Sequence, residues 1–350
     1  MTITRQIYDT ESLLGVMTEL EPVPDYFLSL AFGSQINFDD EFIDFAKVSE
    51  NRKIAPLVVP TTQGRPIYSQ AEKVYRLKPA YVKPKDVVSG AHTIRKRAGL
   101  GELILPTALT PQQRYDSQVS EILRQHRNAI ARRWEWLASK AILDGMVVLE
   151  DDAYPKTTVD FERDAGHTIT KGVGTRWGDS GISIVQDLED WGQLMRDASF
   201  GGPPNRVTVG SSVWPIMRAD AEIKELMRND LRQTSGTSFN FGPRDGLRVE
   251  MMGRINQNLE IWVYSDFYHS ADGTVVPFMD PRDVLLTGPA IDGVRCFGAI
   301  GDIAAGFAPV PVFPKMWNEN DPSATQVMSQ SAPLMVPVNP NASLKARVLA

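Results

Sequence analysis

A long stretch of helical periodicity is the clearest pattern in the chain. Thr110 and Gln113 form a capping-box pair, Pro111 suits the first helical position, and Gly145 is placed to end the helix after Asp144. The apolar side chains that recur at helical spacing are Tyr115, Val119, Ile122, Leu123, Ala129, Ile130, Trp134, Leu137, Ala141 and Ile142. At 1.5 Å per residue this helix would be about 50 Å long. We therefore expect it to act as a spine across the molecule.

After this helix, short apolar runs with strand patterning alternate with helical ones. Strands are expected at 146–150, 157–163, 206–210, 247–252, 259–264, 275–278, 284–287 and 294–300. Helices are expected at 184–197 and from Ser212, as the N-cap, toward Met227, and Asp272-Gly273 predicts a hairpin turn. This mixture predicts an α+β fold with an antiparallel or mixed sheet.

The two ends and the segment before the long helix have different patterns. Residues 1–55 alternate apolar and acidic clusters, which predicts an arm with short helices and no core of its own. Residues 56–105 are extended and interrupted by prolines, so we expect either a loop that needs a partner surface or a floppy surface loop. Prolines recur from Pro309 to Pro340 among apolar side chains, which this subunit or a neighbour must cover.

Composition narrows the function classes. Of 350 residues, 42% are hydrophobic and 23% charged, which is typical of a globular protein, and the net charge of −6 argues against broad nucleic-acid binding. Cys296 is the only cysteine, so neither an intrachain disulfide nor a cysteine zinc site is available. The start of the sequence lacks a signal-peptide pattern, and no apolar run approaches the roughly 20 residues of a membrane span. We expect a soluble protein made in the cytoplasm.

Two short motifs superficially resemble catalytic ones. The run from Gly178 to Gly181, with Ser180, resembles the serine-protease nucleophile, but its further glycine and proline are missing. A turn with Ser180 near a helix start is the alternative that we favour. The glycines from Gly172 to Gly178 loosely resemble a phosphate loop, but Lys171 precedes them and no Gly-Lys-Ser/Thr sequence exists, which favours a β-turn.

The remaining polar candidates also favour structural roles. His92, His126, His167 and His269 are widely spaced, and His126 is expected to be packed and hydrogen-bonded beside the apolar stripe of the long helix. The acidic run 150–152 is better explained as a solvated strand end than as a cation site. The basic runs 95–97 and 132–133 could contact DNA phosphates or pair with acids of another subunit, and the seven tryptophans are expected to serve packing. We therefore assign no catalytic, cofactor-binding or metal-binding residue, and expect no enzyme and no cofactor.

Several runs, in order, resemble the lambda-type major capsid protein family (capsid protein E). They are Tyr81-Val-Lys-Pro-Lys85, His92-Thr-Ile-Arg-Lys96, the long helix with Arg124 to Trp134, Gly288 to Gly298 with Arg295 and Phe297, Phe313-Pro-Lys-Met-Trp317, Gln330-Ser-Ala-Pro-Leu-Met335, and the close from Pro337 to Leu349. The resemblance covers the chain from about residue 25 to its end.

The resemblance implies the Hong Kong-type tailed-phage major capsid fold. Its parts would be an N-terminal arm at 1–55 and an extended loop at 56–105. They would continue with a peripheral domain at 106–184 with the spine helix at 110–145, an axial domain at 185–305, and a C-terminal segment at 306–350 that returns to the peripheral domain.

The resemblance also implies a function and partners. Copies would form hexamers and pentamers that close into an icosahedral shell around double-stranded DNA, assembled in the host bacterial cytoplasm and present in the virion. The early start of the extended loop leaves little room for a scaffolding region, so a separate scaffold protein is expected beside a portal. No residue specifies a decoration protein, and DNA would contact the inner face without sequence specificity. We further expect that removing residues 1–25 leaves the monomer folded but blocks assembly.

Two alternatives stay open at this point. An encapsulin-like nanocompartment shell would have the same fold, and the neighbouring genes would distinguish it from a phage capsid. A soluble α+β hydrolase would need a polar catalytic cluster that the sequence does not supply.

Overall fold

A computed structural model describes residues 7–20, 25–40, 42–47, 73–89, 110–151, 154–226, 242–243, 248–255, 258–270, 272–321 and 324–350. The helices are α1 (Thr10–Glu19), α2 (Phe27–Ala31), α4 (Pro111–Asp144), α5 (Ile184–Asp197) and α6 (Trp214–Ala219), with short 3-10 turns at Ala165–His167, Ile303–Ala305 and Pro340–Ala342. None of the described helices is both long and apolar enough to cross a membrane.

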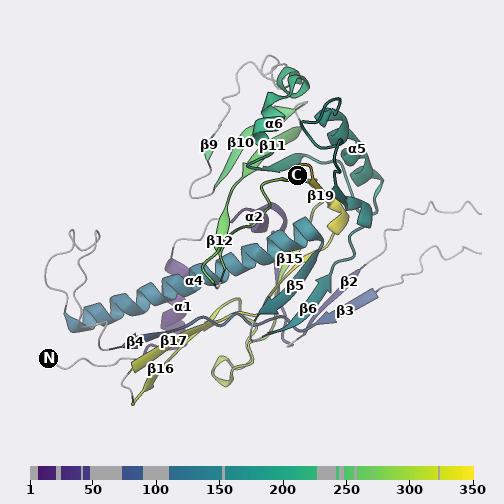
Figure 1. Ribbon diagram of the computed structural model, residues 1–350. Coiled ribbons are helices and arrows are strands. Elements are labelled where there is room, and N and C mark those ends of the chain that lie inside the picture. The colour runs from purple at the N-terminus through teal and green to yellow at the C-terminus, as the bar shows by residue number, and fades with distance from the viewer. Residues whose placement is uncertain are drawn as a thin grey trace, which may run out of the picture.

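The strands build a mixed α+β architecture around one large sheet (Figure 1). Its order is β7 (Thr168–Thr170), β19 (Ser343–Arg347), β14 (Asp283–Thr287), β8 (Arg206–Gly210), β11 (Leu259–Tyr264), β10 (Val249–Ile255) and β9 (Gly242–Pro243). The β7–β19 and β8–β11 pairs are parallel and the other pairs are antiparallel. The expectation of a mixed sheet is confirmed.

Smaller sheets and ribbons lie along α4. One three-stranded sheet has the order β1 (Ser34–Asn37), β15 (Gly293–Phe297) and β18 (Pro333–Pro337), and another has β16 (Phe313–Glu319), β17 (Ala324–Gln330) and β4 (Lys85–Ser89). Three two-stranded ribbons pair β2 (Ile43–Lys47) with β3 (Lys73–Leu77), β5 (Met146–Asp151) with β6 (Tyr154–Asp160), and β12 (Phe267–His269) with β13 (Val275–Pro277). Strands β16 and β18, which contain prolines, are edge strands, as the missing N–H requires.

The long helix α4 has the predicted bounds and caps. Thr110 accepts from the Gln113 backbone N–H and the Gln113 side chain accepts from the Thr110 N–H, so the capping box is complete. Gly145 ends the helix in the left-handed region, at φ 67°. Figure 1 shows α4 running beneath the large sheet and past the strands of the smaller ones, as expected of a spine.

The large sheet is buried on both faces because its side chains alternate between two cores. On β8, Val207 and Val209 pack beneath α5 and α6, whereas Thr208 faces the opposite core. On β14, Leu285 faces the core that contains α2 and the C-terminal half of α4. A third core lies at the other end of α4, between α1 and the sheet β16–β17–β4.

Several sequence expectations need correction. The strand expected at 157–163 is β6, at Tyr154–Asp160, and the strands expected at 247–252 and 294–300 are β10 and β15 with shifted bounds. The helix expected from Ser212 begins at Trp214 with Val213 as N-cap, and it ends at Ala219. Asp220 interrupts it because its carboxylate accepts from the N–H groups of Glu222 and Ile223, which start a new helical turn.

The N-terminal and C-terminal segments both pack on the body of their own chain. Within the expected arm, Tyr26, Phe27 and Phe32 are fully buried in the main core of the same chain. The apolar C-terminal residues are covered by their own subunit, and β19 joins the large sheet between β7 and β14. Most of the expected extended loop lies outside the described residues, and its described part contributes β3 and β4.

Candidate functional site

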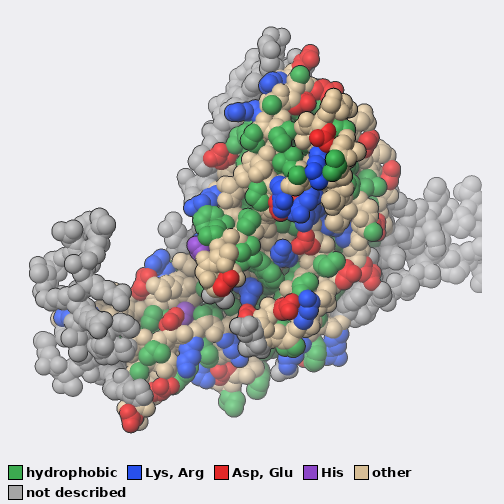
Figure 2. Space-filling model, in the orientation of Figure 1, with side chains coloured by type: hydrophobic (Ala, Val, Ile, Leu, Met, Phe, Trp, Pro, Cys, Tyr) green, Lys and Arg blue, Asp and Glu red, His purple; other side chains and the backbone are tan. Residues whose placement is uncertain are grey.

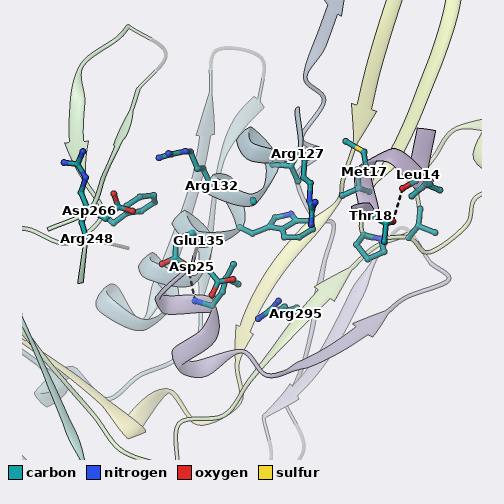
Figure 3. Close-up of a pocket in the computed structure, with 18 residues that line it drawn as sticks. Leu14, Met17, Thr18, Asp25, Arg127, Arg132, Glu135, Arg248, Asp266 and Arg295 are labelled. Carbon is teal, nitrogen blue, oxygen red and sulfur yellow. Dashed lines mark hydrogen bonds between the residues drawn. The ribbon is translucent and has the colours of Figure 1, made fainter. Parts of the chain in front are cut away.

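A cavity of about 570 Å³ lies where the N-terminal segment meets α4 (Figure 3). Its lining combines apolar side chains from α1, α2 and α4 with charged ones. The charged lining residues are Asp25, Arg127, Arg132, Glu135, Arg248, Asp266 and Arg295. Segments distant in sequence meet in this region.

Glu135 anchors the N-terminal segment on α4. Its carboxylate accepts from the backbone N–H groups of Tyr26 at 3.0 Å, Phe27 at 2.7 Å and Leu28 at 3.0 Å. These groups belong to the start of α2 and have no partner within that helix. Glu135 is only 5% exposed, and burial raises its pKa to about 7, although the three N–H donors act in the opposite direction. Figure 3 shows its side chain pointing from α4 toward α2.

The opposite side of the same segment is anchored on the large sheet. The Tyr26 hydroxyl and the Thr208 hydroxyl of β8 are 2.6 Å apart. The Tyr264 ring of β11 lies 5.2 Å from the Tyr26 ring and 5.0 Å from the Phe27 ring. Because the α2 segment contacts both α4 and the large sheet, it lies between them and connects them.

The arginines around the cavity mostly donate to backbone carbonyls. Arg295 Nε donates to Phe32 O at 2.7 Å, and Arg127 donates to Leu20 O at the end of α1. Arg132 donates to Phe267 O at 3.4 Å. Arg295 thus binds the backbone just after α2 and Arg127 the end of α1, whereas Arg132 links α4 to β12, so these charges have structural roles.

A second group of charged side chains holds the C-terminal end of α4. Arg163 donates to Ile142 O at 2.6 Å and Leu143 O at 2.8 Å, two carbonyls of the last helical turn that have no partner within the helix. Burial lowers the pKa of Arg163 to about 10, so it stays charged at neutral pH. A Cβ at Gly145 would lie 2.8 Å from Arg163 Cβ, so glycine is required there for space as well as for its positive φ.

Ion pairs then join this helix end to the large sheet. Lys345 on β19 lies 2.8 Å from Asp144 of α4 and 3.3 Å from Asp283 of β14. Asp283 is 1% exposed and also accepts from Arg347 at 2.9 Å. Burial raises the pKa of Asp144, but Lys345 and Lys140 outweigh it and the pKa is lowered. Figure 2 shows basic and acidic side chains mixed around this part of the molecule.

The two motifs with superficial catalytic resemblance are turns. Ser180 is exposed in a turn that precedes α5, whose N-cap is Ser183, so the expected turn near a helix start is confirmed. Lys171, beside the glycines of the loose phosphate-loop pattern, pairs with Asp187 at 2.6 Å. The charge of Lys171 is therefore paired with a carboxylate of the same chain.

The histidines and acids have structural contacts. His126 is 2% exposed and lies 3.1 Å from Ser329 Oγ and 3.0 Å from Asp86, which confirms the expectation of a packed, hydrogen-bonded side chain. His167 is buried and lies 3.1 Å from Ser343 O. His269 is the last residue of strand β12. His92 lies outside the described residues. Among the residues that the structure describes, no three metal-ligating side chains come together.

The described residues of the acidic run form ion pairs with basic side chains of the same chain, one of them from the basic run 132–133. Glu150 pairs with Lys156 at 3.2 Å and Asp151 with Arg133 at 3.3 Å, whereas Asp152 lies outside the described residues. The run 95–97 also lies outside them. Among the tryptophans, the rings of Trp177 and Trp191 stack at 5.7 Å in the core beneath α5, a packing role.

Sequence reasoning missed both Glu135 and Arg163. A signal for Glu135 was present, because it shares a helix face with Ala131, Ala138 and Ile142. No comparable local signal marked Arg163, whose partners come from α4, β7 and β19. The carbonyls at a helix end are visible only once the fold brings a donor to them.

Comparisons with known proteins agree with this architecture. Relatives over nearly the whole chain include the major capsid protein of Enterobacteria phage P21, 28% identical over 341 residues (96% of this chain, 97% of the relative), and that of Escherichia phage lambda, 27% identical over 340 residues (96% and 97%). The major capsid protein of Enterobacteria phage phi80 is 24% identical over 347 residues (98% and 99%).

Solved structures show the fold. The crystal structure of a prophage capsid protein from Escherichia coli CFT073 superposes with a TM-score of 0.72 at 22% identity, covering 98% of this chain and 100% of that one. A phage-related protein from Bordetella bronchiseptica RB50 gives a TM-score of 0.53 at 12% identity, with 98% of each chain covered. The Hong Kong-type expectation is confirmed.

The sequence family settles which class of protein this is. Residues 9–348 match the family described as Phage major capsid protein E, a family of structural shell proteins and not of enzymes. The whole-length relatives are named as major capsid proteins of phages, which favours a phage capsid over an encapsulin-like compartment. This chain belongs to the phage major capsid protein E family.

Proposed function

We propose that this protein is the major capsid protein of a tailed phage, whose copies form hexamers and pentamers that close into an icosahedral shell around double-stranded DNA. The observation that carries the proposal is the family match from residue 9 to residue 348 on a chain with the same fold. Closed point-group contacts between identical subunits are the usual route to such assemblies.

The described surface supports self-association. Met146 and Val148, on one face of the β5–β6 ribbon, are 41% and 36% exposed, and isolated two-stranded ribbons are marginal in water. Strands β1 and β4 are edges of their sheets, and Ile36 and Val87 on them are 47% and 42% exposed. Unpaired edges with apolar side chains favour contact with another chain.

Parts of the fold fit the family's architecture. We assign residues 1–55 to the N-terminal arm, 56–105 to the extended loop, 106–184 to the peripheral domain and 185–305 to the axial domain. Residues 306–350 return through β16, β17 and β18 beside α4, but their last strand, β19, completes the sheet of the axial domain. This arrangement supports a division into a peripheral and an axial domain that both contain strands of the C-terminal segment.

The proposal includes partners and a location. A separate scaffold protein and a portal would act during assembly in the host bacterial cytoplasm, and DNA would contact the inner face of the virion shell without sequence specificity.

Electron microscopy of the purified protein, expressed alone and with its neighbouring phage genes, tests the proposal. We expect closed particles or capsomers in at least one of these preparations. A dispersed monomer in both, at concentrations where light scattering still detects no association, would contradict the proposal.

A further inference from the structure

A projecting loop, residues 301–311, carries two large apolar side chains that are exposed to solvent. Ile303 is 89% exposed and Phe307 is 57% exposed. Figure 1 shows the loop below the smaller strands, and Figure 2 shows hydrophobic side chains projecting at that edge of the molecule. Exposed apolar groups that lie together are a mark of interaction surfaces.

The loop is held rigidly by hydrogen bonds. Asp302 accepts from the Ala304 N–H at 2.9 Å, from Lys315 Nζ at 3.0 Å and from Gln330 Nε2 at 3.0 Å. At the base, the Tyr81 hydroxyl donates to Ala299 O at 2.8 Å and accepts from the Gly301 N–H at 3.2 Å. A rigid loop loses little entropy when it binds, because its conformation is already fixed.

The loop also keeps an unfavourable backbone conformation. Gly306 and Phe307 follow one another with φ of 60° and 59°. Glycine adopts this left-handed region freely, but a bulky aromatic residue rarely does. Such strain persists where the surrounding structure enforces it and is found at functional positions. Here it presents an aromatic ring to solvent, which folding alone does not require.

The chemistry of the loop fits a second copy of this chain. Residues 303–311, Ile-Ala-Ala-Gly-Phe-Ala-Pro-Val-Pro, carry no charged side chain. Identical chains each carry a net charge of −6, so a contact between copies is favoured where like charges are absent. The tip of the loop lacks the Lys and Arg side chains that supply the charge for binding DNA phosphates.

We propose that the loop 301–311 is an intersubunit contact, in which a second copy of this chain covers Ile303 and Phe307. This inference rests on the proposed function, since it assigns one of the surfaces through which the shell would assemble. The loop is preorganised for this contact by the bonds of Asp302 and Tyr81.

The first test compares Ile303→Ser, alone and with Phe307→Ser, with Val173→Ser as a matched control. Val173 is 87% exposed in a different loop, so the control removes an equally exposed apolar side chain. We expect the Ile303 and Phe307 variants to melt at the wild-type temperature before assembly but to give at least tenfold fewer closed particles. The control should assemble normally.

Two outcomes would overturn the inference without touching the proposed function. The first is a wild-type particle yield from the double variant. The second is an equal loss of particles in the Val173→Ser control. If the double variant does not fold, Ile303→Ser alone decides the matter, because Ile303 has no positive φ. Failure of the wild-type protein to form any assembly would instead count against the proposed function.

A second test identifies what covers the loop. Photoreactive benzoylphenylalanine replaces Phe307, and particles are assembled from a mixture of ¹⁵N-labelled and unlabelled chains. We expect cross-linked peptide pairs in which one peptide comes from a labelled copy of this chain and the other from an unlabelled copy. Cross-links only within one copy, only to another protein, or none at all would overturn the inference.

Discussion

Two charged side chains, the buried Glu135 and the half-buried Arg163, bind the backbone of distant segments rather than each other. Glu135 accepts three N–H groups at the start of α2, and Arg163 donates to two carbonyls at the end of α4. Groups at helix ends have no partner inside the helix, so a buried end must find one elsewhere. In this protein one carboxylate and one guanidinium meet that need.

The raised pKa of Glu135 gives the stability a specific pH dependence. Burial raises its pKa to about 7 in the fold from an ordinary value of 4.5, so the folded state holds the proton more tightly. The contribution of this group to stability is therefore complete below about pH 4.5 and is lost as the pH rises through 7. We expect the free energy of unfolding of wild type, relative to Glu135→Gln, to fall by about 3 kcal/mol between pH 5 and pH 8.

Urea unfolding of the unassembled protein at several pH values measures this difference. Glu121→Gln is the matched control, because Glu121 lies exposed on the same helix and its pKa is lowered, chiefly by Arg124. Its difference from wild type should stay constant over that pH range. Parallel stability curves for wild type and Glu135→Gln would show that the buried carboxyl does not titrate as described.

Removal of Arg163 should destabilise the end of the long helix. Arg163→Met leaves Leu143 O without this donor and Ile142 O with only the hydroxyl of Ser343, and an unsatisfied buried group costs about 1–3 kcal/mol. We expect a loss of about 2 kcal/mol in the free energy of unfolding. Arg124→Met, which removes an exposed arginine of the same helix, should change little. Equal effects of the two variants would argue against the capping role.

At the scale of elements, α4 is shared by two cores. Its N-terminal half packs with α1 and the sheet β16–β17–β4, and its C-terminal half packs with α2, β5 and β18. The helix α1 buries Leu13 and Met17 in the first of these cores. The structure thus revises the expectation that residues 1–25 can be removed without harm to the monomer, because their loss would open that core.

The contribution of α1 can be measured by a single substitution. Leu13 is 2% exposed, and Leu13→Ala should lower the free energy of unfolding by about 3 kcal/mol through lost burial and the cavity left behind. Leu14→Ala, at the half-buried neighbouring position, should cost clearly less. Thermal and urea unfolding of the unassembled protein provide the comparison. If Leu13→Ala were as stable as wild type, α1 would be a detachable arm after all.

At the scale of the whole molecule, charged pairs join the body around α4 to the large sheet. Lys345 bridges Asp144 of the helix and Asp283 of the sheet, and α2 forms a second connection through Glu135 and Thr208. These polar contacts add to the apolar core that packs α2 and the C-terminal half of α4 against the sheet. Shell proteins that change shape during maturation would need such connections to hold in one state and rearrange in another.

A double-mutant cycle tests the first connection. Asp144→Asn and Lys345→Met, singly and together, should give a coupling energy of about 1 kcal/mol, because their side chains are only 31% and 21% exposed. The same cycle on Glu150 and Lys156, both about 60% exposed, should give almost none. Equal coupling in the two pairs would mean that Lys345 and Asp144 contribute no more than a surface contact.

The sequence by itself determined the elements whose signals are local. The bounds and caps of α4, the helix α5, the strands β8 and β11 and the turn at Gly273 follow from periodicity, capping residues and glycine, so they were predictable. The family could be recognised because the sequence runs that resemble it occur in the expected order along the chain.

Only the tertiary structure decided which segments meet. Glu135, Arg163 and Lys345 acquire their roles from partners more than 20 residues or even 200 residues away, which no local pattern encodes. The burial of α2 and the insertion of β19 between β7 and β14 are likewise long-range pairings. The physical reason is that periodicity and caps act over one or two turns, whereas buried polar groups are satisfied by whatever the completed fold brings within hydrogen-bonding distance.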